Sequence, residues 1–161
     1  MNLIKELTDK NGHVLVNVPA NPIVLMEMGF SYEEAKNLCL PPIEDVKSEK
    51  IAAIKNQRDK IIADYIIIGI NHFHSDASSR IQQISLTKMG QAKQIPPGLM
   101  WQSKNNGLIE LTNDIAAQFE TVTMEHDMRL FANAQHHIAA VEALEEVQAV
   151  IEYDYSTGWQ P

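Results

Sequence analysis

Histidine is the residue type in this sequence whose chemistry and spacing suit a catalytic or metal-binding role. His72 and His74 would lie on one face of a strand, because side chains two residues apart in a strand point the same way. His126 and His137 fall on one stripe of a predicted helix, and His136 adjoins them. Two such pairs meeting in space could hold a metal ion, since neutral imidazole is a common metal ligand. No Asp or Glu completes a recognised ligand spacing, however, so we expect no metal, no cofactor and histidines that are hydrogen-bonded or exposed.

The other reactive residues also favour a structural interpretation. Cys39 is the only cysteine, which excludes an internal disulfide and a cysteine-rich zinc site, and its position between two leucines predicts a small buried residue. The pair Glu145 and Glu146 is typical of a helix surface. The sequence contains neither a glycine-rich phosphate-binding loop nor a G-x-S-x-G nucleophile elbow. We therefore expect a protein that is not an enzyme; a small metal-dependent enzyme built on the histidines is the alternative.

Length and charge narrow the range of partners. At 161 residues the chain is long enough for one domain with a real core, or for one domain with a small appendage. A net charge of −8 opposes nucleic-acid binding, which requires a basic patch. No run reaches the roughly 18–20 apolar residues of a membrane span, and the first residues lack the apolar region of a signal peptide. These features predict no membrane insertion and synthesis in the cytoplasm, from which a virus particle could later carry the protein.

Residues 1–42 are predicted to form a small N-terminal interaction module. It opens with two alternating apolar runs on either side of a turn that ends at Gly12, and this pattern predicts a β-hairpin. In the second run, Val14, Val16 and Val18 would share one face of the hairpin.

Two short helices and a boundary follow this hairpin. Asn21 before Pro22 is typical of a helix start, and Ser31 with Glu34 forms a capping box in which each side chain satisfies the other residue's backbone N–H. The proline pair at 41–42 then stops the second helix and marks the end of the module.

The main domain, residues 43–161, is predicted to be mainly helical with a small antiparallel sheet, which gives an α+β fold class. A helix over about 43–64 places Ile54 and Ile61 at core spacing with Arg58 between them. This favours an amphipathic core helix over a self-associating coiled coil. The remaining predicted elements are a strand over 66–73, a helix over 77–92 capped within Ser75–Ser79, and a long helix capped by Thr112 or Asn113, with a break near 139–142 as an open alternative.

The clearest local pattern is a hairpin over about 99–111. Gly107 follows two asparagines and supplies the left-handed residue of a three-residue loop. In that register Trp101 faces Leu111. Four apolar side chains then share one face and are expected to anchor the sheet to a helix: Leu99, Trp101, Ile109 and Leu111.

Trp159 and Tyr155 are candidate partner-binding residues near the C-terminal end. Aromatic side chains are enriched at protein contacts, and a terminal segment frays unless something docks it. The alternative is that both ends of the chain fold back on the protein's own core.

Several motifs follow one another in a characteristic order between about Val46 and Pro161. They include a serine-rich helix start with Asp76 and Arg80, then Trp101-Gln102, Asn105-Asn106-Gly107 and the closing Gly158-Trp159-Gln160-Pro161. Their order and spacing resemble a domain of unknown function found in tail-fibre, tail-fibre-assembly and related tail proteins of bacteriophages and prophages. The residues that carry this structural motif are Asp76, Arg80, Trp101, Asn106 and Gly107. The resemblance brings no catalytic residues.

What the resemblance implies is a role in building the phage tail. The first expectation is a non-catalytic structural protein of the virion tail, made in the host bacterial cytoplasm and located at the baseplate or at the point of fibre attachment. Its partners would be other tail proteins, either fibre or baseplate chains, and it would form a homo-oligomer within the assembly. A tail-fibre assembly chaperone, which binds fibre chains and then leaves, is the alternative.

Overall fold

The computed structural model describes residues 2–161 and is mainly helical, with 51% of the chain in helices. Within that range the strands form three separate antiparallel pairs. In chain order the elements are β1 (Leu3–Thr8), β2 (Val14–Pro19), α1 (Pro22–Glu27), α2 (Tyr32–Leu38), α3 (Ile43–Ile62), β3 (Tyr65–Ile68), β4 (Asn71–His74), α4 (Ala77–Gln91), β5 (Met100–Gln102), β6 (Leu108–Glu110), α5 (Asn113–Ala116), α6 (Phe119–Glu142) and α7 (Val147–Glu152). The predicted α+β, mainly helical fold class is confirmed.

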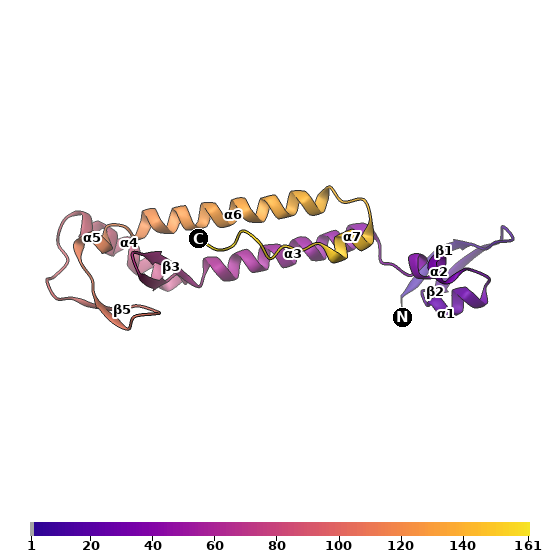
Figure 1. The fold of residues 1–161 in the computed structure, drawn as a ribbon, viewed down its shortest axis with the longest axis horizontal. Helices are drawn as coiled ribbons and strands as arrows, with labels where there is room; N and C mark the ends of the chain where they lie inside the picture. Colours follow the sequence, from indigo (N-terminus) through magenta and orange to yellow (C-terminus); the bar gives the residue numbers. More distant parts are fainter. Residues whose placement is uncertain (1) are drawn as a thin grey trace.

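The molecule is elongated around a long helical hairpin (Figure 1). Helices α3 and α6 run side by side along its middle, and the segment after α7 returns along them. The first two strands with α1 and α2 lie at one end of this rod, and β3 to α5 lie at the other. The two ends are therefore separated by the length of α6, whose 24 residues span about 36 Å.

The middle of the rod is held by one hydrophobic cluster. Ile54 of α3 is fully buried in this cluster, which also contains Trp159 and, from α6, Leu130, Ala134 and Val141. The residues spaced three or four apart on α3 thus face α6, as expected for an amphipathic core helix.

A second cluster fills the end of the rod beyond α3, and here one prediction is wrong. The apolar run over 66–73 is not a single strand, because Gly69 adopts a left-handed φ of +62° and the chain reverses there. The resulting hairpin pairs Ile66 of β3 with Phe73 of β4. Both side chains are buried. The Phe73 ring packs edge to face on Phe119 of α6, with the ring centres 5.1 Å apart.

The hairpin of β5 and β6 exists, but its register differs from the prediction by two residues. Trp101 pairs with Ile109 rather than with Leu111, so the loop spans residues 103–107. Hydrogen bonds within the loop stabilise it. The N–H and the hydroxyl of buried Ser103 both donate to the Gly107 carbonyl at 2.8 Å. A shift by two keeps every side chain on its face. The four predicted apolar residues therefore do pack together on the second cluster, and Gly107 has the predicted left-handed φ of +66°.

Thr112 caps a helix as predicted, but that helix is short. Its hydroxyl accepts the Ile115 N–H at 3.2 Å and starts α5, which ends at Ala116. The chain bends at 117–118 before α6 begins, so the single long helix expected from Thr112 is in fact two.

The N-terminal module has its own small hydrophobic cluster, and every buried member of it lies between Leu7 and Ala35. The caps of its two helices form as predicted, including the reciprocal capping box of Ser31 and Glu34. The predicted face of the second strand is wrong: Val18 is buried while Val16 is exposed. Asn17 between them has a φ of +54°, which turns the strand over at that point.

Gly90 of α4 packs directly against the backbone around α5, and this contact allows a test of the packing. A Cβ at Gly90 would lie 2.6 Å from the Ala117 nitrogen and 2.7 Å from the Asn113 oxygen, both backbone atoms. Gly90→Ala should therefore lower the free energy of unfolding by about 2–4 kcal/mol, although alanine normally favours a helix by about 1 kcal/mol. Urea unfolding measures this, with the neighbouring exposed Gln91→Ala as control. A stabilised Gly90→Ala protein would contradict the packing of α4 on α5.

Candidate functional site

Arg80 lies at the junction where α3 ends, α4 begins and α6 passes. Its Nη1 and Nη2 donate to the two carboxylate oxygens of Asp127 on α6, at 2.6 and 2.8 Å. Nη2 also donates to the Ile62 carbonyl at the end of α3, at 3.0 Å, and Nε donates to the Ser75 carbonyl at 2.8 Å. The Arg80 and Asp127 side chains are only 24% and 20% exposed. One guanidinium therefore joins three segments that are far apart in the sequence.

Local sequence places Arg80 at this junction. The Asp76 carboxylate accepts hydrogen bonds from the Ser79 N–H at 3.0 Å and from the hydroxyls of Ser78 and Ser79 at 2.7 Å each. These bonds hold the pKa of Asp76 well below its usual range. They also fix the start of α4 at Ala77, as predicted, so that Arg80 follows one turn later.

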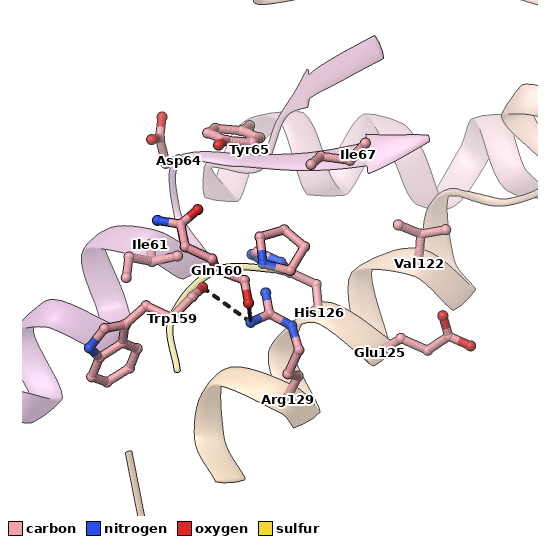
Figure 2. Close-up of a pocket in the computed structure, with 11 residues that line it drawn as sticks. Ile61, Asp64, Tyr65, Ile67, Val122, Glu125, His126, Arg129, Trp159 and Gln160 are labelled. Atoms are coloured by element: carbon pink, nitrogen blue, oxygen red, sulfur yellow. Dashed lines mark hydrogen bonds between the residues drawn. The ribbon is translucent and has the colours of Figure 1, made fainter. Parts of the chain in front are cut away.

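A pocket of about 420 Å³ opens next to this junction, between the end of α3, β3, α6 and the C-terminal residues (Figure 2). Its walls are largely apolar, with Ile61, Ile67 and Val122 among them. His126 and Arg129 of α6 are among its nitrogen-bearing residues, together with Gln160 of the C-terminal segment. The pocket combines an apolar volume with a few polar atoms, which is the usual character of a small binding site.

His126 is the polar residue of this pocket without a full set of partners. Its Nε2 is buried and has no hydrogen-bond partner within residues 2–161. Burial lowers the pKa of His126; a hydrogen bond involving the Ile61 backbone acts in the opposite direction, and the charge of Arg129 lowers it further. The ring is therefore held in its neutral form to lower pH than an exposed histidine.

Arg129, in contrast, is occupied by the chain itself. Its Nη1 donates to the carbonyls of Trp159 and Gln160 at 3.1 and 2.9 Å, and both bonds are drawn in Figure 2. The C-terminal segment thus forms one wall of the pocket.

Trp159, a candidate partner-binding residue, is buried in the protein's own core. The Trp159 side chain is only 4% exposed. Its ring stacks on that of His137, with the ring centres 5.8 Å apart, and its Nε1–H donates to the Tyr155 carbonyl at 2.6 Å. Tyr155 is half-buried on the same cluster, with the Lys50 ammonium 5.7 Å from its ring centre. At this end of the chain the C-terminal segment folds back on the core, which was the alternative. Packing there removes the apolar surface of Trp159 from water.

Two further residues fasten the C-terminal segment and were not expected to do so. A carbonyl oxygen can only accept, so the Nε2–H of His137 donates to the Thr157 carbonyl at 2.8 Å, and Nδ1 lies 2.8 Å from the Tyr153 hydroxyl. Asn133 donates to the same carbonyl at 3.0 Å. Gly158, with a φ of +83°, leaves no room for a Cβ beside Asn133, which accounts for the glycine of the closing motif.

His72 and His137, one from each of the two predicted histidine pairs, have different partners in the structure. His72 stacks flat on Tyr65 at 4.3 Å on the β3–β4 hairpin, while His137 is bonded to the C-terminal segment. Across residues 2–161, no group of three or more His, Cys, Asp or Glu side chains could hold a metal ion.

The remaining motif residues join the two hairpins at this end of the rod. Asn106 donates to the Ile70 carbonyl at 3.1 Å and to the Asn71 side chain at 2.9 Å. The Asn105 side chain donates to the Ile70 carbonyl and accepts a hydrogen bond from the His72 N–H, both at 2.8 Å. Trp101 is half-buried on the second cluster. The asparagine pair therefore ties the 103–107 loop to the turn at Gly69, a contact that the sequence pattern did not reveal.

The Arg80 junction leads to a stability prediction. Arg80→Ala should lower the free energy of unfolding by about 2–4 kcal/mol, because it leaves the sheltered Asp127 carboxylate and the Ile62 carbonyl without their donors. Urea unfolding measures the loss, with the exposed Lys60→Ala as control. The double variant Arg80→Ala/Asp127→Ala should lose less than the sum of the two single variants. Additive losses would show that the two side chains act independently.

His126 leads to a pH prediction. Its folded-state pKa lies below the unfolded value of about 6.5, so as the pH falls through that value the unfolded chain takes up a proton that the folded chain does not. The His126 contribution to stability should therefore be present above about pH 6.5 and decline below it. Urea unfolding between about pH 7.5 and 5.5 should show a shallower decline for His126→Gln than for wild type. Equal slopes would mean that the ring is solvated.

Comparison with known proteins places most of the chain in one family. Residues 45–157 match the family model described as a domain of unknown function, DUF4376. The matched range runs from the first turn of α3 to the C-terminal segment and leaves the hairpin and helices of the N-terminal module outside. No curated protein and no solved structure gives a significant match. Within residues 2–161 no helix is long and apolar enough to cross a membrane. The match covers well over half of the sequence, and the chain therefore belongs to the DUF4376 family.

Proposed function

We propose that this protein is a non-catalytic structural component of a bacteriophage tail, located at the baseplate or at the point of fibre attachment. It acts by binding other tail proteins, either fibre or baseplate chains. The observation that carries the proposal is the N-terminal module, which stands at one end of the rod with its own cluster and with apolar side chains turned to solvent.

The module exposes several large apolar side chains to solvent. Val14 and Val16 of β2 are 59% and 66% exposed, and Ile23 and Tyr32 of the two helices are similarly uncovered. A hairpin with two short helices has too small a core to be very stable alone. A neighbouring chain that covered these residues would stabilise the module and bury apolar surface at the same time.

The order of motifs along the main domain supports the assignment to a phage tail. That order resembles a domain of phage tail-fibre, tail-fibre-assembly and related tail proteins. The motif residues form hydrogen bonds and contacts within the protein, as at the Arg80 junction and the 103–107 loop, and this supports an architectural role for them. A rod with a separate module at one end suits a protein that joins two other chains.

A tail-fibre assembly chaperone is the second candidate. The same exposed valines of β2 favour it, since a chaperone also offers apolar surface to an unassembled fibre chain. The two functions differ in where the protein is found after assembly.

The test is mass spectrometry of washed, gradient-purified virions. We expect the protein to be retained in wild-type particles, and Val16→Glu to remove it from them while leaving the soluble protein folded, because Val16 contributes exposed surface rather than core. Ile151→Glu, an exposed apolar residue of α7, is the matched control and should be incorporated normally. Absence of the wild-type protein from virions, together with a soluble complex with fibre chains in infected cells, would replace the structural role with the chaperone.

A variant without residues 1–41 tests the two-part organisation. The remaining chain should keep a near-normal melting temperature but fail to join the particle. If it unfolds or aggregates, the N-terminal residues belong to the main core and the module is not an independent docking element.

A further inference from the structure

A second pocket, of about 300 Å³, lies between β4, the start of α4 and β5, at the end of the rod opposite to the N-terminal module (Figure 1). Most of its lining side chains carry polar groups, and one is a large aromatic; they include His74, Ser79, Gln82, Gln83, Trp101 and Gln102. Among the residues that the structure describes, no Asp, Glu, Lys or Arg lines this pocket. We call it the glutamine pocket.

Gln83 of α4 brings a hydrogen-bond acceptor without a partner to the glutamine pocket. The residue is only 4% exposed, and its Nε2–H donates to the His74 carbonyl at 2.7 Å, which fixes the orientation of the side-chain amide. The Oε1 atom is buried and has no hydrogen-bond partner within residues 2–161. A buried acceptor without a donor is unfavourable, so this pocket favours a ligand that brings an O–H or N–H group to Oε1.

The Trp101-Gln102 motif contributes an apolar surface and a further polar group to the same pocket. Trp101 is half-buried on the second cluster and also lines the pocket, so the core holds the indole ring in place. Gln102 is exposed, and its Nε2–H donates to the Ser103 carbonyl at 2.8 Å, which leaves its Oε1 as an acceptor. The motif therefore combines an aromatic surface with an amide in adjacent residues.

The chemistry of the glutamine pocket fits a neutral sugar. A glutamine amide both donates and accepts hydrogen bonds, and so does each hydroxyl group of a sugar. The C–H groups of a sugar ring carry a weak positive charge, which suits the negative face of an indole. A carboxylate or phosphate would find no Lys or Arg among the lining residues, and an ammonium group would find no Asp or Glu. The absence of such charges among these residues favours a ligand without charge.

We propose that the glutamine pocket binds a neutral saccharide, whose ring packs on Trp101 and one of whose hydroxyl groups donates to Oε1 of Gln83. The exposed amides of Gln82 and Gln102 bind further hydroxyl groups at the entrance. This site goes beyond the proposed tail function and does not depend on it, because the N-terminal module lies at the other end of the rod. The virion test above and the tests below can therefore fail separately.

Two-dimensional NMR of the full chain tests the position of the site. The probes are the methyl glycosides of glucose, galactose, mannose and N-acetylglucosamine, each added to about 50 mM so that weak binding is detected. The chain has two tryptophans, and each indole N–H gives its own signal. At least one glycoside should shift the signals of Trp101 and of the Gln83 side-chain amide, and leave that of the buried Trp159 unchanged. No shift of Trp101 with any glycoside, or equal shifts of Trp101 and Trp159, would overturn the proposal.

Variants of the full chain test the groups that bind, with the glycoside that binds wild type most tightly. Gln102→Ala should raise its Kd about threefold to tenfold, because one hydrogen bond is lost at an exposed position. Gln83→Met, which is similar in size, should raise it about tenfold or more, and its melting temperature shows whether it is folded. Gln135→Ala, an exposed glutamine on α6, is the matched control and should bind like wild type.

Two results of this second experiment would contradict the proposal. If Gln102→Ala binds the glycoside as wild type does, the sugar lies elsewhere, and this variant decides the question even if Gln83→Met does not fold. Methyl glucuronide tests the preference for a neutral ligand, since its carboxylate finds no Lys or Arg among the lining residues. Tighter binding of the glucuronide than of every neutral glycoside would show that the pocket selects an anion.

Discussion

The hydrogen bonds of the Arg80 guanidinium are the constraint on which the arrangement of α3, α4 and α6 depends. A helix that ends leaves carbonyl groups without donors, and the Ile62 carbonyl at the end of α3 obtains its donor from Arg80. The same guanidinium holds Asp127 of α6, so the separation of the two long helices is fixed near their junction with the β3–β4 end. Lysine could not replace it, because a single ammonium cannot span a carboxylate and two other acceptors in one plane.

Sequence reasoning succeeded where structure is local. The capping residues of α1, α2 and α4, the left-handed Gly107 and the core spacing of α3 were all predicted, because each depends on neighbours within a few residues. It failed where an apolar run concealed a turn. Gly69 lies within a run of isoleucines that reads equally well as one strand, and only the pairing of Ile66 with Phe73 shows that the chain reverses.

The candidate site was less accessible to such reasoning, for a physical reason. Arg80 and Asp127 are 47 residues apart, so no spacing rule connects them. For Trp159 the sequence left partner binding and packing on the protein's own core as alternatives, because a terminal aromatic has no local partner that decides between them. Its actual partners, His137 on α6 and Tyr155, are brought to it by the return of the chain along the helical hairpin. The sequence motif thus identified positions that matter but not the contacts that they make.

The core of the helical hairpin also has a consequence for synthesis. Ile54 of α3 lies in one cluster with Leu130 and with Trp159, which follows it by about a hundred residues. At about 5–20 residues per second, a ribosome needs on the order of 5–20 s to produce the segments that cover α3. During that interval the apolar side of α3 is exposed on the nascent chain, and the charged residues along its other side keep it in solution until the hairpin closes.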